Sequence, residues 1–116
     1  MQLFLQKGNY GNKQYFSEQT FDAFNTCYYA DKGVQRGLGF DKRIEKGGPT
    51  CACVSPSSFG HTGFTGNIAW VDPETEIVYV FLSNRTYPEV INEENKLSRG
   101  KIREDIQQII QDAIIK

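Results

Sequence analysis

The chain has no excess of charge of either sign and no long apolar run. Its 116 residues carry 13 Lys and Arg against 14 Asp and Glu, a balance that leaves no electrostatic footprint for nucleic acid or an acidic membrane. The longest uninterrupted apolar run is Ile77 to Leu82, far short of the ~20 residues that a membrane span requires. We therefore expect neither nucleic-acid binding nor a membrane span.

The first residues lack the pattern of a secretory leader. The segment Met1 to Gly8 has no basic stretch and reaches a glycine early, which predicts instead the last turns of a helix stopped at Gly8. Localisation stays open, because export of a longer parent chain to the periplasm or cell envelope is compatible with this start. A chain of this length predicts one small domain over residues 1–116.

Cysteines are few and their number is odd. Cys27, Cys51 and Cys53 argue against a disulfide framework. The pair Cys51 and Cys53 with His61 nearby invites a zinc hypothesis, but a closed structural zinc site needs four ligands and no second pair exists. We expect no metal and no other cofactor, and three small buried thiols.

The most informative segment of the sequence is glycine-rich: Gly60-His61-Thr62-Gly63-Phe64-Thr65-Gly66. Each glycine inside a regular element costs roughly 0.5–1 kcal/mol relative to alanine, so glycine at every third position asks for a reason. A backbone without Cβ atoms lets a ligand lie against it. The segment therefore predicts a ligand site beside a strand.

The surrounding pattern predicts an α+β fold: an antiparallel sheet of three to four strands, a C-terminal amphipathic helix and short N-terminal helices. Strands are expected near 37–43, 58–62, 66–72 and 76–84, with a turn at Asp72 to Thr75. Ser17 is expected to cap a short helix that carries Phe21 and Phe24 on one face. The residues 77–82 are apolar at every position, which predicts a central strand covered on both sides. In the last helix an apolar stripe is expected to dock on the sheet: Ile102, Ile106, Ile109, Ile110, Ala113 and Ile114.

At these residues the chain resembles the C-terminal portion of the serine β-lactamase and penicillin-binding-protein fold, in its class C and family VIII esterase branch. The order is His-Thr-Gly in place of a Lys-Thr-Gly box, then Trp70-Val71-Asp72-Pro73, then a strand ending in Ser83-Asn84-Arg85 and a closing helix. Upstream, Lys7 to Thr20 is similar to that branch's helix-end and loop passage, and Gly37 to Phe40 to its next strand. The chain is more similar still to the β-lactamase-like domain fused to some Bacteroidetes glycoside hydrolases.

The resemblance implies roles for four consecutive residues. The backbone N–H of Phe64 would be one of two oxyanion donors, Thr62 would hydrogen-bond the substrate or a second base, and Gly63 would admit the substrate. His61 would replace the box lysine. Since an imidazole of ordinary pKa, about 6.5, is mostly neutral at pH 7, the resemblance favours esters or peptides over penicillins.

The same resemblance implies that a nucleophile is missing. The family's Ser-x-x-Lys and Tyr-x-Asn boxes lie far upstream of the His-Thr-Gly box, but only 59 residues precede Gly60. Two segments match these boxes by letter alone. Ser98 to Lys101 lies after His61 and is expected to be a helix cap or loop, and Tyr10-Gly11-Asn12 is expected to be an exposed loop.

Two hypotheses follow. In the first, the chain is the C-terminal piece of a serine acyl hydrolase for β-lactam, ester or peptide substrates, inactive alone and completed by the missing N-terminal half. In the second, it is a non-catalytic peptide-binding, glycan-binding or dimerisation module. In either case self-association, as a dimer or by exchange of elements, is expected from the apolar sheet.

Overall fold

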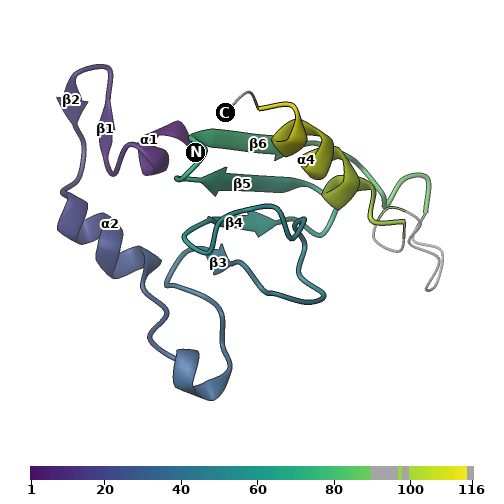
Figure 1. The fold of residues 1–116 in the computed structure, drawn as a ribbon, viewed down its shortest axis with the longest axis horizontal. Helices are drawn as coiled ribbons and strands as arrows, with labels where there is room; N and C mark the ends of the chain where they lie inside the picture. The colour runs from purple at the N-terminus through teal and green to yellow at the C-terminus, as the bar shows by residue number, and fades with distance from the viewer. Residues whose placement is uncertain (90–96, 98–99, 115–116) are drawn as a thin grey trace.

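The computed structural model describes residues 1–89, 97 and 100–114, and its largest element is a four-stranded antiparallel sheet crossed by one long helix (Figure 1). The helices are α1 (Gln2–Leu5), α2 (Glu18–Asn25), the 3₁₀ turn η1 (Ala30–Lys32) and α4 (Ile102–Asp112). The strands are β1 (Asn9–Tyr10), β2 (Lys13–Gln14), β3 (Asp41–Lys42), β4 (Phe59–Thr62), β5 (Ile68–Asp72) and β6 (Ile77–Phe81). The predicted α+β architecture is confirmed.

The sheet has the order β3-β4-β5-β6, so strands next to each other in the sequence pair in space. In the register of β4 with β5, His61 lies opposite Ala69 and Thr62 opposite Ile68. The β5–β6 turn follows from Asp72, whose Oδ1 accepts a hydrogen bond from the N–H of Glu74 at 3.1 Å. This side-chain bond fixes the turn that the sequence predicts at Asp72 to Thr75.

The two faces of the sheet carry separate apolar clusters. On one face Ile68, Trp70 and Tyr79 pack with Cys51 and Val54, and Ile106 of α4 adds to them. On the other face Phe59 and Val71 pack with Phe21, and α1 adds further apolar side chains. Because side chains alternate along a strand, Trp70 and Val71 of β5 serve opposite faces.

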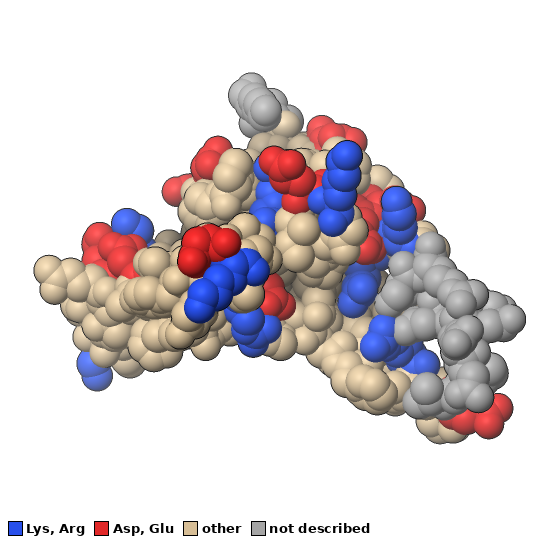
Figure 2. All heavy atoms as spheres, turned by 90° about the horizontal axis from the view of Figure 1, so that it is seen from below, with Lys and Arg blue, Asp and Glu red and all other residues tan. Residues whose placement is uncertain are grey.

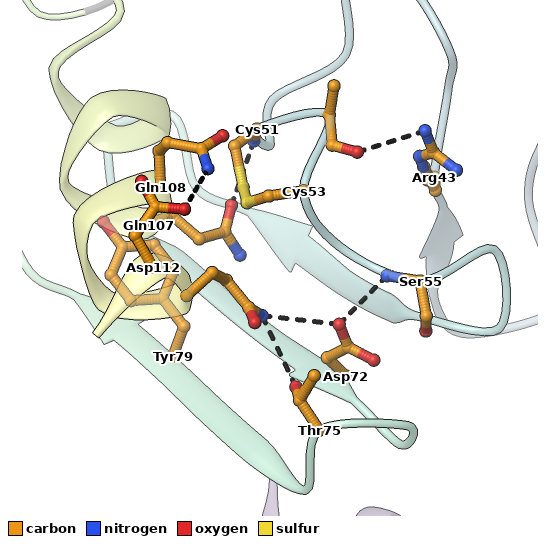
Figure 3. The surroundings of a disulfide bond; sticks show 12 residues. Arg43, Cys51, Cys53, Ser55, Asp72, Thr75, Tyr79, Gln107, Gln108 and Asp112 are labelled. Carbon is orange, nitrogen blue, oxygen red and sulfur yellow. Dashed lines mark hydrogen bonds between the residues drawn. A yellow bond between two sulfur atoms is a disulfide. The ribbon is translucent and has the colours of Figure 1, made fainter. Parts of the chain in front are cut away.

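Helix α4 docks through polar side chains rather than through the apolar stripe that the sequence predicts. Its buried residues are Arg103 and Gln107, while Ile102 and Ile109 are 42% and 68% exposed. The prediction holds for Ile106, which packs on the sheet, but not for the stripe as a whole, because the surface under the helix includes loop backbone that needs hydrogen bonds. Gln107 Oε1 accepts from the N–H of Cys51 at 3.1 Å, and Gln111 Nε2 reaches Asp72 Oδ2 at 3.4 Å (Figure 3).

Two strand predictions also need correction. The strand expected near 37–43 is confined to Asp41–Lys42, because Gly37 to Phe40 forms a turn closed by a 2.8 Å bond from Gly37 N–H to Phe40 C=O. The apolar strand at 77–82 is not central: within the described residues β6 is the outer strand of the sheet. Its core-side residue Tyr79 is buried, whereas Val80 is 52% exposed.

The cysteines differ from the three buried thiols that the sequence predicts. Cys51 and Cys53 are joined in a disulfide, with Cα atoms 5.1 Å apart (Figure 3). Cys27 is free and half-buried. An odd count left one thiol over, as expected, but it did not exclude a bridge between two near neighbours.

At the N-terminal end, Ser17 caps α2 as predicted, its side-chain oxygen accepting from the N–H of Thr20 at 3.1 Å. Phe21 is buried under this helix, but Phe24 is 49% exposed, so the expected shared face is only half correct. The polar loop expected before Phe16 contains the β1–β2 hairpin, which Figure 1 shows away from the four-stranded sheet.

The surface shows no separation of charge on the face seen in Figure 2, where basic and acidic side chains lie next to one another. This matches the near balance of 13 basic and 14 acidic residues. Among the described helices, none has the length and hydropathy needed to cross a bilayer.

Candidate functional site

The four residues singled out by the sequence form the end of β4 and the start of its turn. His61 and Thr62 are the last residues of the strand, and Gly63 and Phe64 follow directly. On one side β4 is paired with β5 up to Thr62. On the other side β3 reaches only Gly60, which lies opposite Asp41. The edge of β4 at His61 and Thr62 is therefore left open by β3.

The open edge leads to an available backbone donor. Gly63 N–H donates to Asn67 C=O at 2.8 Å, toward β5. Gly63 C=O accepts from Gly66 N–H at 2.9 Å, and the Phe64 N–H, which shares a planar trans peptide group with that carbonyl, points to the opposite side. Within the part of the chain that the structure describes, no acceptor takes this N–H. The Phe64 side chain is 74% exposed.

The turn after β4 is stabilised by hydrogen bonds from the segment that follows β6. Gly66 N–H closes the turn onto Gly63 C=O at 2.9 Å. Ser83 Oγ donates to Thr65 C=O at 3.1 Å, and Arg85 Nε donates to Phe64 C=O at 2.6 Å. The segment Ser83 to Arg85 thus fixes the carbonyls of Phe64 and Thr65 in this turn, a role that its sequence did not disclose.

The three glycines of the segment have different physical reasons. Gly60 is buried between strands, and a Cβ there would lie 2.7 Å from Trp70 Cα. Gly66 has φ +93°, a left-handed conformation that favours glycine. A Cβ on Gly63 would meet only ordinary contacts, the nearest being Asn67 Cβ at 3.5 Å. Packing therefore explains two of the glycines and leaves Gly63 without a structural reason.

His61 is held in a chain of polar contacts that the sequence did not reveal. Arg36 Nη2 lies 2.8 Å from His61 Nε2, and Arg36 Nη1 lies 2.6 Å from Asp41 Oδ1. His61 Nδ1 lies 2.6 Å from the carbonyl oxygen of Thr62. The signal that could have found Arg36 was the pair of glycines at 37 and 39, which indicates a tight turn that brings Arg36 back against Asp41.

A depression of about 420 Å³ adjoins the same strand end and is lined by Thr62, Asp41, Arg103, Glu104 and the segment 47–49, among others. Arg103 is only 7% exposed and its Nη1 donates to Gly66 C=O at 3.3 Å. Its Nε has no acceptor among the described residues. Within those residues no three His, Cys, Asp or Glu side chains gather in a way that could hold a metal ion.

Of the two segments that matched catalytic boxes by letter, Tyr10-Gly11-Asn12 is described by the structure and lies in the β1–β2 hairpin. Gly11 and Asn12 have φ +58° and +61° and form the turn of the β1–β2 hairpin, so Tyr10 belongs to an exposed turn as predicted. Ser98 lies outside the described residues. The N-cap position of α4 is Lys101, which makes no side-chain capping bond.

The chain is similar to known proteins in sequence and in fold. The β-lactamase family model matches residues 3–103. Two relatives are each named putative D-alanyl-D-alanine carboxypeptidase. One, from Escherichia coli O157:H7, is 32% identical over 90 residues, and the other, from Salmonella enteritidis PT4, is 33% identical over 96 residues. These matches cover 78% and 79% of this chain but only 21% of each relative.

A solved β-lactamase from Mycobacterium bovis has the same fold, with a TM-score of 0.64 at 23% sequence identity. The match covers 94% of this chain and 40% of that structure. The chain thus spans about a fifth of the length of the curated relatives it matches. From the family match over residues 3–103 and these relatives, the chain belongs to the β-lactamase family.

Proposed function

We propose that this chain supplies the substrate-facing strand of a serine acyl hydrolase, with His61, Thr62, Gly63 and the Phe64 N–H as its contribution. The observation that carries the proposal is the open edge of β4, where β3 stops opposite Gly60. An extended peptide can add to such an edge by main-chain hydrogen bonds.

The unpartnered Phe64 N–H supports the role of an oxyanion donor. In acyl transfer the attacked carbonyl oxygen becomes negatively charged, and losing one preorganised donor costs about 10²–10³ in rate in other enzymes. The Gly63–Phe64 peptide group is held on its carbonyl side, because Gly63 C=O accepts from Gly66 N–H at 2.9 Å, so its N–H is fixed before any substrate arrives. Gly63, for which packing gives no reason, keeps the approach to this N–H free of a side chain.

The nucleophile must come from elsewhere. No Ser-x-x-Lys sequence precedes His61 in these 116 residues. We therefore propose that the chain is inactive alone and acts with the part of a β-lactamase-type domain that its relatives have outside the matched segment. The names of the relatives make an acyl-D-alanyl-D-alanine peptide the substrate to try first.

The outer strand β6 supports such a partner. Val78, Val80 and Leu82 are 37%, 52% and 77% exposed, and β6 carries no charged residue or proline between Ile77 and Phe81. Natural proteins protect free sheet edges with such residues. We propose that the rest of the domain covers this strand, since this chain represents only 40% of the solved β-lactamase.

The strand proposal can be tested on the chain itself. Amide resonances are followed while a millimolar acyl-D-alanyl-D-alanine peptide is added. The proposal expects shifts centred on Thr62, Gly63 and Phe64, and their loss in Gly63→Val. Shifts elsewhere, or equal shifts in the variant, would remove the support for a substrate strand and favour the second hypothesis, a non-catalytic binding module.

A further inference from the structure

We infer that Arg36 is a positioning residue that fixes the tautomer of His61, with the proton on Nδ1, and that Arg36 itself supplies the positive charge beside the His-Thr-Gly segment. The inference starts from two contacts of one imidazole. Its Nε2 faces Arg36 Nη2 at 2.8 Å, and its Nδ1 faces Thr62 C=O at 2.6 Å.

The hydrogen-bonding capacity of the two partners decides where the proton lies. A guanidinium has only donors, so His61 Nε2 must accept from it and carries no proton. A backbone carbonyl only accepts, so His61 Nδ1 must donate to Thr62 and carries the proton. A proton on Nε2 would place one N–H against another. The two contacts therefore select the tautomer with the proton on Nδ1.

The fold holds Arg36 in this place through the turn that the sequence did not predict. Arg36 and Asp41 form an isolated antiparallel bridge, and the N–H of Lys42 donates to Gln35 C=O at 3.0 Å. Gly37 has no room for a side chain, since a Cβ would lie 3.2 Å from Asn25 Cα and closer still to the Phe24 carbonyl. Arg36 therefore returns alongside β3, next to β4.

Three other charged groups lie in the same region. Asp41 of β3 is bonded to Arg36 at 2.6 Å and partly balances its charge. Arg103 and Glu104 of α4 line the depression that Thr62 also lines. Of these groups, Arg36 is the one with a direct contact to the imidazole.

This arrangement assigns the positive charge beside the His-Thr-Gly segment to Arg36 rather than to His61. Arg36 stays protonated throughout the pH range in which proteins work, so the positive charge beside the strand does not depend on pH. His61 Nε2 is occupied and is not a free base. If the proposed function holds, on which this consequence alone rests, a substrate carboxylate at the open edge meets a guanidinium rather than an imidazolium.

The chain contains a single histidine, which makes the test unambiguous. Imidazole ¹⁵N spectra are recorded as a function of pH on the wild-type chain and on Arg36→Leu, Arg36→Lys and Lys13→Gln. The last variant removes a positive charge from the exposed hairpin strand β2. The wild type should show a bare Nε2 and a protonated Nδ1 at neutral pH.

In Arg36→Leu, Nε2 loses the donor that it faces, so part of the neutral imidazole should move its proton from Nδ1 to Nε2. Arg36→Lys should restore most of the wild-type behaviour, and Lys13→Gln should change nothing. A wild-type proton on Nε2, or the same ¹⁵N tautomer signature in all four proteins, would overturn the inference. Neither readout needs a substrate, so failure here is distinct from failure of the peptide titration.

Discussion

The glycines at 60, 63 and 66 look alike in the sequence, yet the structure gives them different reasons. A side chain at position 60 would collide with Trp70 on the neighbouring strand β5. Gly66 has a left-handed backbone that favours glycine. Gly63 is free of both constraints. A periodic pattern can thus indicate a special backbone without telling which member faces a ligand.

Valine at positions 60 and 63 should separate these reasons. Gly63→Val is expected to leave the free energy of unfolding of this chain within about 0.5 kcal/mol of wild type, since its surroundings are open. Gly60→Val should destabilise it by at least the ~1–3 kcal/mol typical of overpacking. Urea unfolding measures both. A large loss in Gly63→Val would show that Gly63 serves packing, and the assignment of His61, Thr62 and Phe64 as substrate-facing would lose its main support.

Tyr79 gives a residue-scale prediction about pH. Burial raises the pKa of its phenol, with Arg103 opposing and Glu104 adding to that effect, and its hydroxyl donates to Arg103 C=O at 3.0 Å. Because the folded-state pKa lies above the unfolded value of about 10, the stability from the neutral phenol is complete below pH 10. It is lost as the pH rises through the folded-state pKa.

Tyr79→Phe should therefore cost about 0.5–1.5 kcal/mol at pH 7, the contribution of the lost hydrogen bond, and should show a smaller loss of stability between pH 9 and roughly pH 11 than wild type. Urea midpoints across this range provide the measurement. Tyr15→Phe, at an exposed position, serves as the control. Parallel pH profiles for wild type and Tyr79→Phe would contradict the account.

At the scale of elements, α4 shows where periodicity misleads. The spacing of isoleucines predicts an apolar docking stripe, but the helix docks through Arg103 and Gln107 because loop backbone beneath it requires partners. Such a need belongs to the tertiary arrangement, and no window of the sequence contains it. An unpaired buried N–H costs about 1–3 kcal/mol, enough to outweigh the burial of one more exposed isoleucine.

Gln107→Ala tests this docking. Removal of Oε1 leaves the Cys51 N–H without its acceptor, and the free energy of unfolding should fall by about 1–3 kcal/mol. Gln108→Ala is the matched control, because the hydrogen bond of Gln108 among the described residues goes to Asp112 on the same helix, and it should change stability by less than about 0.5 kcal/mol. Equal effects of the two substitutions in urea unfolding would refute the polar docking of α4.

Much of the fold could be predicted from the sequence, where local signals and tertiary demands agree. The strands β4, β5 and β6, the turn at Asp72 and the cap at Ser17 lie where their patterns indicate. The failures have tertiary causes. Gly37 to Phe40 turns instead of extending, and apolar β6 has no strand on its outer side within the described chain. The strand at His61 was predictable, whereas Arg36 was not, because its contact crosses 25 residues of sequence.

At the scale of the whole molecule, the chain has the fold of a β-lactamase segment in which the outer strand β6 is partly exposed. Val71 is fully buried beside α1, whereas its cross-strand neighbour Val78 is 37% exposed. Exposed apolar patches of this kind mark interaction sites when they are contiguous. The proposed occupant is the rest of a β-lactamase-type domain.

Substitution of Val80 tests the occupant. The part of the Escherichia coli relative outside the matched segment is expressed separately. Its binding to this chain is measured and compared with its binding to the relative's own matched segment. The chain should bind as the relative's own segment does, and Val80→Lys should abolish binding while leaving the free energy of unfolding within about 0.5 kcal/mol. Val71→Lys should unfold the chain. Binding unaffected by Val80→Lys would contradict the proposal.

The central claim is that the chain carries the substrate strand of an acyl hydrolase but not its nucleophile. Labelling by a fluorescent penicillin tests it most directly, because acylation of a serine leaves a covalent mark. The 116-residue chain should remain unlabelled, and Ser98→Ala should behave identically. Stoichiometric labelling that Ser98→Ala abolishes would show that Ser98 is a nucleophile within this chain, and the account would be wrong.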